Sequence, residues 1–444
     1  MTKTPIPRLI ITLSIPTIIS MLVTNVYNLV DTGFVGMLGT SASGAVGIVF
    51  GFMAILQAIG FLFGQGAGSI LSRLLGKHDT DGASKAAATG FWGALILSVI
   101  AEIICFIFLD DVVTMLGSTP TIAPFAKTYI TYILLAAPFT TASFTMNNIL
   151  RYEGKASLGM VGLLVGAVLN MAGDPLFMFT LDMGIAGAGL STCISQVISF
   201  GILLSYFLRG KTTCKLGFRN AYFNASYITN IITTGLPSLL RQGLQSASTI
   251  ILNMAASPYG DAAIAGMSAV SRIIFFVFSV CLGIGQGFQP VSAFNYGANK
   301  YGRVRSAFKY AFLMATVLIF LLSDVVYVFA EPLVRRLRDD PEVIVIGVRA
   351  LKLQCLTQIF LPFCTMTEML LQSTGKRLQA SILSSLKSGI IFIPVLLLLA
   401  HFRGLAGIQE SQPVSNILQV IPCVILAIWY FKKLPLKDDA SSHL

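Results

Sequence analysis

The stretch Gly64-Gln65-Gly66 returns 221 residues later as Gly285-Gln286-Gly287, and this repetition decides the fold. The same shift, without a gap, places Pro16 on Pro237, Gly76 on Gly297 and Gly154-Lys155 on Gly375-Lys376. Duplication of a whole membrane unit is typical of secondary transporters, in which the substrate path runs between the two copies. We therefore predict an N-terminal lobe over residues 1–220 and a C-terminal lobe over residues 221–444.

The composition is that of a membrane protein. Hydrophobic residues make up 55% of the 444 residues and charged residues only 11%, with a mean hydropathy of +0.80. Such values are far more apolar than those of soluble domains. Runs of about 20 apolar residues can cross the hydrocarbon core as helices. Twelve runs qualify: 9–36, 43–71, 86–109, 122–149, 156–180, 186–208, 229–256, 262–290, 306–330, 343–370, 379–400 and 408–431.

The predicted fold is therefore an all-α polytopic membrane protein with twelve transmembrane helices in two six-helix repeats. Six is an even number, so both copies enter the membrane from the same side and form parallel repeats. The +11 net charge follows this topology, because 21 of the 30 Lys and Arg residues, Lys437 among them, fall in segments on one side. The positive-inside rule makes that side cytoplasmic, with both termini there, and we expect no nucleic-acid partner.

Signals for an enzyme are poor. Histidine occurs only at His78, His401 and His443, so the sequence offers no HExxH motif and no membrane-embedded metal cluster. The seven cysteines are scattered without a CxxC pair and resemble small buried hydrophobic residues. The apolar run after Lys3 and Arg8 lacks a cleavage site, so we interpret it as an uncleaved first helix. We expect no enzymatic activity and no cofactor.

Ionisable residues inside the predicted spans are few, and each requires a partner, a proton or a water-filled cavity. Asp31 and Asp174 differ from the others in their polar company. Asn170 precedes Asp174 by one helical turn and faces the same way, and Thr192 enters on the next helix from the opposite side. With Tyr129, they all lie roughly 8–15 Å below the outer boundary, counted at about 1.5 Å per residue. Two carboxylates, an amide and a hydroxyl at one depth can hold a proton or an alkali cation.

These residues carry a resemblance to the multidrug and toxic compound extrusion (MATE) family, and within it to the DinF-like and MepA-like bacterial branch. The first helix reads Pro16 … Asn28-Leu-Val-Asp31-Thr-Gly-Phe-Val-Gly36, and the fifth contains Asn170 … Asp174-Pro175-Leu-Phe177. The sixth reads Gly184-Ile-Ala-Gly187-Ala-Gly189 … Thr192. The resemblance covers essentially the whole chain.

The resemblance implies roles for individual residues. In similar transporters the residues that match Asp31, Asn170, Asp174 and Thr192 form the cation-coupling site, which makes them a possible Na⁺ site here. The tyrosine that matches Tyr129 joins that network, and the proline that matches Pro16 is where the first helix bends between states. The coupling ion is H⁺ or Na⁺, and the sequence leaves this choice open.

The second copy departs from this pattern. The 221-residue shift places Leu252 opposite Asp31 and leaves Asp174 without an acidic counterpart. NorM-like members instead rely on acidic groups of the C-terminal lobe, for which Glu368 is the weak candidate. Arg241 and Arg272 are the other notable charges there, and we expect them to pair with Glu102, Asp324 or a helix carbonyl rather than to bind substrate.

The sequence therefore predicts a multidrug efflux antiporter that exports organic cations and drugs in exchange for H⁺ or Na⁺. We expect a multi-pass protein of the bacterial cytoplasmic (inner) membrane that functions as a monomer in the lipid bilayer. Two alternatives remain at this point. One is a lipid-linked-precursor flippase of the same superfamily, which tends to have a strongly cationic cavity and extra helices. The other is a membrane scaffold or receptor that transports nothing.

Overall fold

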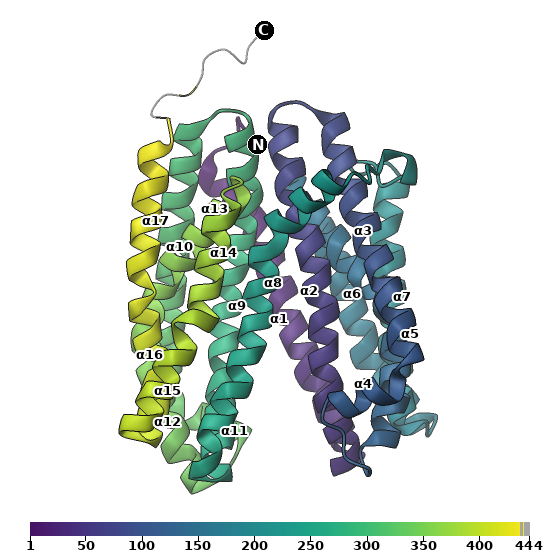
Figure 1. Cartoon of the computed structure of the whole chain (residues 1–444), viewed down its shortest axis with the longest axis vertical. Helices are drawn as coiled ribbons and strands as arrows, with labels where there is room; N and C mark the ends of the chain where they lie inside the picture. The colour runs from purple at the N-terminus through teal and green to yellow at the C-terminus, as the bar shows by residue number, and fades with distance from the viewer. Residues whose placement is uncertain (436–437, 439–444) are drawn as a thin grey trace. The chain divides into compact units, whose positions relative to one another are not determined.

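The computed structural model describes residues 1–435 and residue 438; Lys437 and His443 lie outside the described residues. All regular elements of the described part are helices, as predicted. Contacts divide the chain into two compact units. We call Ile19–Leu239 the N-terminal unit, and Met1–Ile18 together with Leu240–Leu444 the C-terminal unit. Figure 1 shows the helices of each unit.

The N-terminal unit contains most of the first helix and the start of the eighth. Its elements are α1 (Ile6–Gly36), α2 (Thr40–Gly76), α3 (Thr80–Ile107), α4 (Leu109–Met115), α5 (Ala123–Tyr152), α6 (Ala156–Pro175), the π-helical segment η1 (Leu176–Thr180), α7 (Gly184–Leu208), the 3₁₀ turn η2 (Phe218–Asn220) and the first part of α8 (Ala225–Ala256).

The C-terminal unit contains the rest of α8 and the elements that follow it. These are η3 (Ser257–Tyr259), α9 (Asp261–Gly297), α10 (Tyr301–Val328), α11 (Ala330–Leu337), α12 (Pro341–Thr357), η4 (Gln358–Phe360), α13 (Leu361–Ser373), α14 (Arg377–Ser385), the π-helical segment η5 (Leu386–Ile390), α15 (Phe392–Arg403), α16 (Leu405–Leu418) and α17 (Val420–Lys433).

Ten helical stretches of the described chain are long and apolar enough to cross a membrane. Each coincides with one of the predicted spans. The two other predicted spans, 229–256 and 379–400, are helical as well, but neither is a single long helix that is apolar enough to be among these ten. Serine, threonine, asparagine and glutamine are frequent along α8, and η5 divides the second stretch into α14 and α15.

The repeated glycines explain how the two units are built. A Cβ atom on Gly66 would lie 2.2 Å from the carbonyl oxygen of Ile231, in the first part of α8. A Cβ atom on Gly287 would lie 2.4 Å from the hydroxyl of Ser14, in the first part of α1. Glycine is therefore required at both positions, because no side chain fits. Each copy uses its glycine to receive the start of the other copy's first helix.

Because of this exchange, the two structural units differ from the predicted lobes, which divide the chain at residue 220. The first 18 residues belong to the C-terminal unit, and the segment up to Leu239 belongs to the N-terminal unit. Ser238 secures the exchanged part of α8, since its hydroxyl donates a 2.6 Å hydrogen bond to Gln65 of the repeated motif. Pro16 and Pro237 each lie two residues before the point where their helix passes from one unit to the other.

Small residues also set the packing inside the N-terminal unit. Gly60, Gly64 and Gly68 lie along one face of α2, directly against Phe144, Asn148 and Tyr152 of α5. Any larger side chain would push the two helices apart, so close approach is the physical role of this glycine series. Tyr129, nearer the start of α5, lies in a separate buried apolar core of the same unit.

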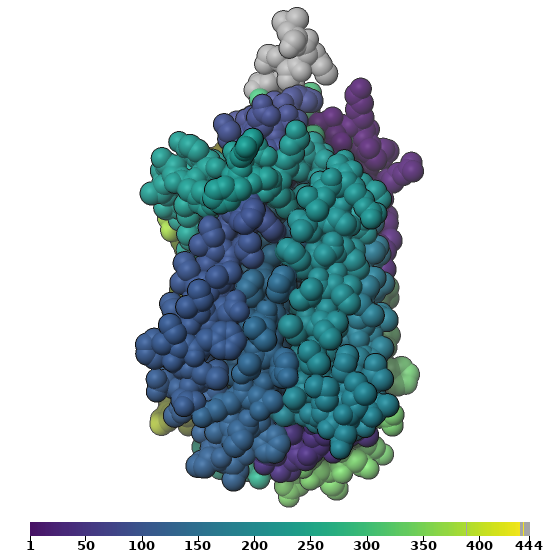
Figure 2. All heavy atoms as spheres, turned by 90° about the vertical axis from the view of Figure 1, so that its right-hand side faces the viewer, coloured from purple at the N-terminus to yellow at the C-terminus, as the bar shows by residue number. Residues whose placement is uncertain are grey.

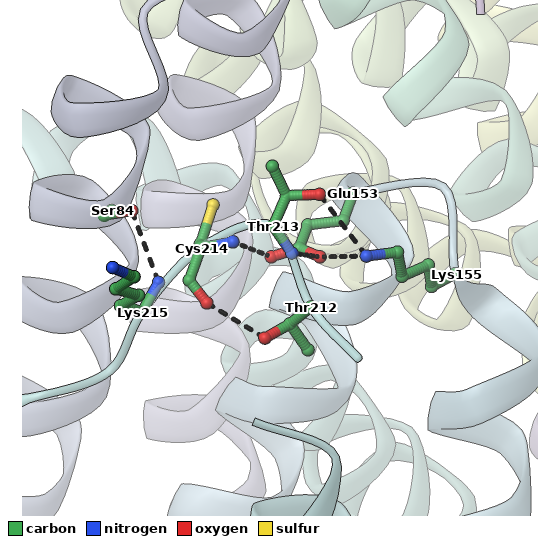
Figure 3. A network of polar contacts seen from close by, with 7 residues as sticks. All are labelled: Ser84, Glu153, Lys155, Thr212, Thr213, Cys214 and Lys215. Atoms are coloured by element: carbon green, nitrogen blue, oxygen red, sulfur yellow. Dashed lines mark hydrogen bonds and ion pairs between the residues drawn. The ribbon is translucent and has the colours of Figure 1, made fainter. Parts of the chain in front are cut away.

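The segment between α7 and α8 is fixed to the N-terminal unit. The side chain of Glu153 is fully buried at the end of α5 and accepts hydrogen bonds from the backbone amides of Thr213 (2.9 Å) and Cys214 (2.8 Å). Lys155 pairs with the same carboxylate at 3.2 Å, and Lys215 N–H donates to Ser84 of α3 (Figure 3). Burial and then the Glu153 carboxylate raise the pKa of the Cys214 thiol, which therefore stays neutral.

Further contacts extend this attachment along residues 209–224, which we call the linker. The indole of Trp92 donates to the carbonyl oxygen of Leu216, and the amide of Tyr222 donates to the hydroxyl of Thr89, so α3 holds the linker at three points. In the face of Figure 2 the linker, coloured teal, lies across the end of the dark blue helices. The linker between the two copies is thus held against the N-terminal unit.

Candidate cation site

Four helices of the N-terminal unit bring the predicted site residues together. Asp31 comes from the last turns of α1, Asn170 and Asp174 from the end of α6, and Thr192 from α7. Tyr129 of α5 closes the group from the apolar core. All five side chains are buried, and Asp174 and Tyr129 are 0% exposed. The structure therefore places at one point the residues that the sequence placed at one depth.

The local backbone around Asp174 is shaped by the next residue. Pro175 has no amide hydrogen, so it cannot donate the usual helical hydrogen bond. Past this gap the chain winds as the π-helical segment η1 instead of continuing as an α-helix, as often happens beside functional residues. The wider turn fits against α7 only because Gly187 has no side chain: a Cβ there would lie 2.6 Å from the Phe177 carbonyl carbon.

Asn170 is the centre of the hydrogen-bond network. Its Nδ2 lies 3.2 Å from Oδ1 of Asp174, 3.1 Å from the hydroxyl of Thr192 and 3.4 Å from the hydroxyl of Ser191. The hydroxyl of Ser191 in turn donates to the backbone carbonyl oxygen of Asn170 at 3.2 Å. These bonds fix α6 against α7 and turn the amide's donor side toward Asp174.

Two residues of the cluster, Tyr27 and Ser191, were not predicted from the sequence. Tyr27 is buried one turn before Asp31 on α1 and lies near both carboxyl groups. Ser191 makes the two contacts with Asn170 described above. The spacing between Tyr27 and Asp31 was the available signal for the first, because residues four apart share a helix face. Ser191 immediately precedes Thr192 and could only be recognised from the contact itself.

The charge of the cluster requires compensation from outside the protein chain. The carboxyl groups of Asp31 and Asp174 are close enough for one to hydrogen-bond the other when a proton is present. No lysine or arginine in the described residues forms an ion pair with either. Buried carboxylates without a basic partner retain a proton or bind a cation.

The unpaired oxygens meet the same requirement. Oδ1 of Asp31, Oδ2 of Asp174 and Oδ1 of Asn170 are buried, and none has a hydrogen-bond partner in the part of the chain that the structure describes. Carboxylate and amide oxygens are the ligands that hard cations prefer, and two of these three oxygens belong to the neighbouring carboxyl groups of Asp31 and Asp174. The residues present therefore fit either a proton shared by the carboxyl groups or a small alkali cation.

The C-terminal candidates are arranged differently. Glu368 of α13 is buried, but Arg241 of α8 pairs with its Oε1 at 2.7 Å, and Ser384 of α14 donates to the same oxygen at 2.6 Å. The expectation that Arg241 pairs with Glu102, Asp324 or a helix carbonyl is therefore wrong. Sequence spacing could not reveal this partner, because the two residues are 127 positions apart.

The remaining candidates lie away from the cluster. Arg272 is exposed on α9 and forms no ion pair with any described residue. Pro16 lies inside α1, which continues as helix on both sides of it. It is fifteen residues before Asp31, so it can act on the cluster only through α1 itself.

Comparison with known proteins places the chain in a family. The MatE family model matches twice, over residues 16–176 and 237–398, and the two matches begin 221 residues apart (16 to 237). The multidrug export protein MepA of Staphylococcus aureus (strain MSSA476) is 26% identical over 96% of this chain and 94% of its own length. MepA of Staphylococcus haemolyticus is 27% identical over 94% of this chain and 91% of its own.

The fold agrees with a solved transporter. The crystal structure of MATE in complex with MaL6 superposes with a TM-score of 0.92 at 25% identity, and covers 97% of this chain and 98% of that one. The family model matches both copies and covers more than half of the chain, which leads to one assignment. The chain belongs to the MatE family of transporters.

Proposed function

We propose that the protein is a secondary active multidrug antiporter that exports organic cations in exchange for H⁺ or Na⁺. The observation that carries this proposal is the buried Asp31 and Asp174 pair, which has unpaired oxygens and no basic partner among the described residues. The MepA relatives, which are named multidrug export proteins, support efflux as the direction of transport.

The cluster works as the coupling site through differential binding. An ion couples to transport only if it binds one conformation more tightly than the other. Asp31 belongs to α1, while Asn170, Asp174 and Thr192 belong to α6 and α7, so a bend of α1 changes the distance between the two carboxyl groups. A cation between them favours the conformation in which they are close, and Pro16 supplies the bend.

Transport then follows by alternating access. In the outward-open state the ion enters the cluster and favours the bent α1, which displaces the bound drug to the outside. Release of the ion to the cytoplasm resets the transporter for the next drug. We place this transporter in the bacterial cytoplasmic membrane as a monomer with cytoplasmic termini, and the lysine and arginine distribution supports the orientation.

The direct test is efflux from proteoliposomes. Purified protein is reconstituted with its cytoplasmic side accessible, and movement of the fluorescent organic cation ethidium is followed under a pH gradient alone and under a Na⁺ gradient alone. We expect one gradient to drive ethidium movement and collapse of that gradient to stop it. Failure of both gradients to move ethidium or other organic cations would reject the proposal.

The same vesicles test the alternative functions. Movement of a lipid-linked precursor analogue between leaflets, in the absence of drug transport, would support the flippase. That function requires a strongly basic cavity, whereas the cluster in the N-terminal unit is acidic. Absence of every flux would support a scaffold or receptor.

A further inference from the structure

The C-terminal unit contains a second buried group of charges that the coupling scheme does not use. Arg241, Glu368 and Lys387 come from α8, α13 and η5. Arg241 and Glu368 form the 2.7 Å pair described above, and their side chains are 7% and 4% exposed. With all three groups ionised, this basic cluster has a net charge of +1 and needs one further negative charge.

Lys387 is the residue that lacks a partner. Its Nζ is buried and finds no hydrogen-bond acceptor among the residues that the structure describes. On one side the ammonium lies 3.5 Å from the centre of the Phe278 ring, a favourable cation–π contact that leaves its N–H groups unsatisfied. A buried ammonium without an acceptor is unfavourable and has to gain an anion, gain water or lose its proton.

A small cavity lies beside this ammonium. Cys364, Glu368, Leu383, Leu386, Lys387, Gln419 and Cys423 line it, and it measures about 10 Å³, about the space that one water-sized molecule needs. Gln419 is 2% exposed, and its Nε2 is the second donor at this cavity with no acceptor in the described chain. Two donors of hydrogen bonds and an excess positive charge thus meet at a space for one small ligand.

The backbone is irregular at the same place. Lys387 belongs to the π-helical segment η5, and Gln419 stands at the break between α16 and α17. Both polar side chains at the cavity thus come from positions where the regular α-helix is interrupted. Local departures of this kind persist where they position a functional group. The first copy has Gly166 and Ile198 at the positions that correspond to Lys387 and Gln419 under the 221-residue shift, so the arrangement belongs to the C-terminal unit alone.

We propose that this cavity binds one halide ion, chloride under physiological conditions, between Lys387 Nζ and Gln419 Nε2. A halide accepts hydrogen bonds from both donors and neutralises the cluster, whereas a water molecule accepts them but leaves the charge. The ion stabilises the C-terminal unit and ties η5 to the junction of α16 and α17. The site is independent of the cation cluster, which lies in the other unit.

The proposal is tested without substitution by anomalous diffraction from crystals of the full chain grown in sodium bromide. We expect one bromide peak between Lys387 Nζ and Gln419 Nε2. A water molecule without an anomalous signal there would overturn the proposal, and so would a Gln419 amide turned so that its Oε1 accepts from Lys387.

A solution measurement provides a second test. Thermal unfolding of the detergent-purified protein is followed while chloride replaces gluconate at constant ionic strength, and we expect the melting temperature to rise with chloride. Lys387→Met should weaken chloride binding by about tenfold or more, because a charged hydrogen-bond donor is lost.

Lys352→Met is the matched control, since Lys352 also lies over an aromatic ring, that of Tyr327, but outside the cavity. It should keep the chloride response of the unsubstituted protein. A melting temperature that does not respond to chloride in the unsubstituted protein, or an equal response in Lys387→Met, would overturn the proposal.

Discussion

Asp31 and Asp174 are buried near each other, and no lysine or arginine of the described residues forms an ion pair with either, so removal of either charge should remove ion coupling. Asp31→Asn and Asp174→Asn keep the size of the side chain and its hydrogen bonds, and we expect both proteins to fold and reach the membrane. Gradient-driven ethidium efflux should fall to the level of empty vesicles. Asp324→Asn is the matched control, because Asp324 is an exposed carboxylate on α10. Full efflux by both single variants would reject the assignment of the site.

Glu368 differs from these aspartates because its charge is already compensated by Arg241. Glu368→Gln leaves the arginine buried without an ionic partner, at a cost of about 3–5 kcal/mol for breaking a buried pair. We therefore expect a clear loss of thermal stability. Efflux per folded molecule should fall less than in Asp31→Asn. A larger loss of efflux per folded molecule would move ion coupling to the C-terminal unit.

At the scale of the helix, α1 and α8 are built alike but contribute different side chains at corresponding positions. Each contains a proline two residues before it passes between units, yet α1 ends near Asp31 whereas α8 presents Leu252 to an apolar core. Pro16→Ala restores a helical hydrogen bond and removes a steric clash, so α1 should resist bending. Ethidium should still bind, while its efflux should fall.

Pro237→Ala is the matched control for this prediction, since α8 has no carboxylate that could sense the bend. Its efflux should fall less. Spin labels at the outer ends of α1 and α8 would measure the opening in each variant. Normal efflux by Pro16→Ala, together with an opening that still responds to the coupling ion, would exclude the hinge.

The linker is an element whose position depends on one carboxylate. Glu153 accepts two backbone hydrogen bonds from the linker, whereas the corresponding residue of the second copy, Thr374, donates to its own helix at Leu370. Lys211 and Lys215 are already exposed, so Glu153→Gln, which weakens this docking, should free the backbone around them to enter the active site of trypsin. Faster cleavage between α7 and α8 is the expected result.

Glu331→Gln is the control for the linker, because Glu331 forms only an exposed pair with Arg335. Its rate of cleavage at the linker should equal that of the unsubstituted protein. If Glu153→Gln is cleaved as slowly as the unsubstituted protein, the contacts of Trp92 and Thr89 suffice to hold the linker.

At the scale of the whole molecule, the sequence determined more of the architecture than of the contacts. Hydropathy and the 221-residue repeat predicted the helices correctly, because burial in lipid acts on each helix separately. The same repeat could not reveal that the starts of α1 and α8 are exchanged, since the reason is a through-space approach at Gly66 and Gly287.

The polar clusters also differ in how far the sequence predicts them. Asp31, Asn170, Asp174, Thr192 and Tyr129 could be grouped by depth alone, and the structure brings them together. The partners of Arg241 and Lys387 depend on how α8, α13 and η5 pack in three dimensions, and depth along a helix says nothing about that.

Antiport by the whole molecule requires the ion and the drug to oppose each other's binding. If the ion weakens drug binding by some factor, thermodynamic linkage requires the drug to weaken ion binding by the same factor. Ethidium affinity, measured by fluorescence in detergent, should therefore fall as the coupling ion is raised. For a typical coupling of about 1–3 kcal/mol, the change is roughly 5–150-fold.

The double variant Asp31→Asn/Asp174→Asn separates this linkage from general effects of pH or salt on the dye. Without its carboxylates the cluster cannot bind the ion, so ethidium affinity should become independent of it, and the constant value reports the ion-free conformation. Asp324→Asn should retain the full dependence. If the double variant also retains it, the ion acts elsewhere in the molecule, and the cluster in the N-terminal unit has a structural role only.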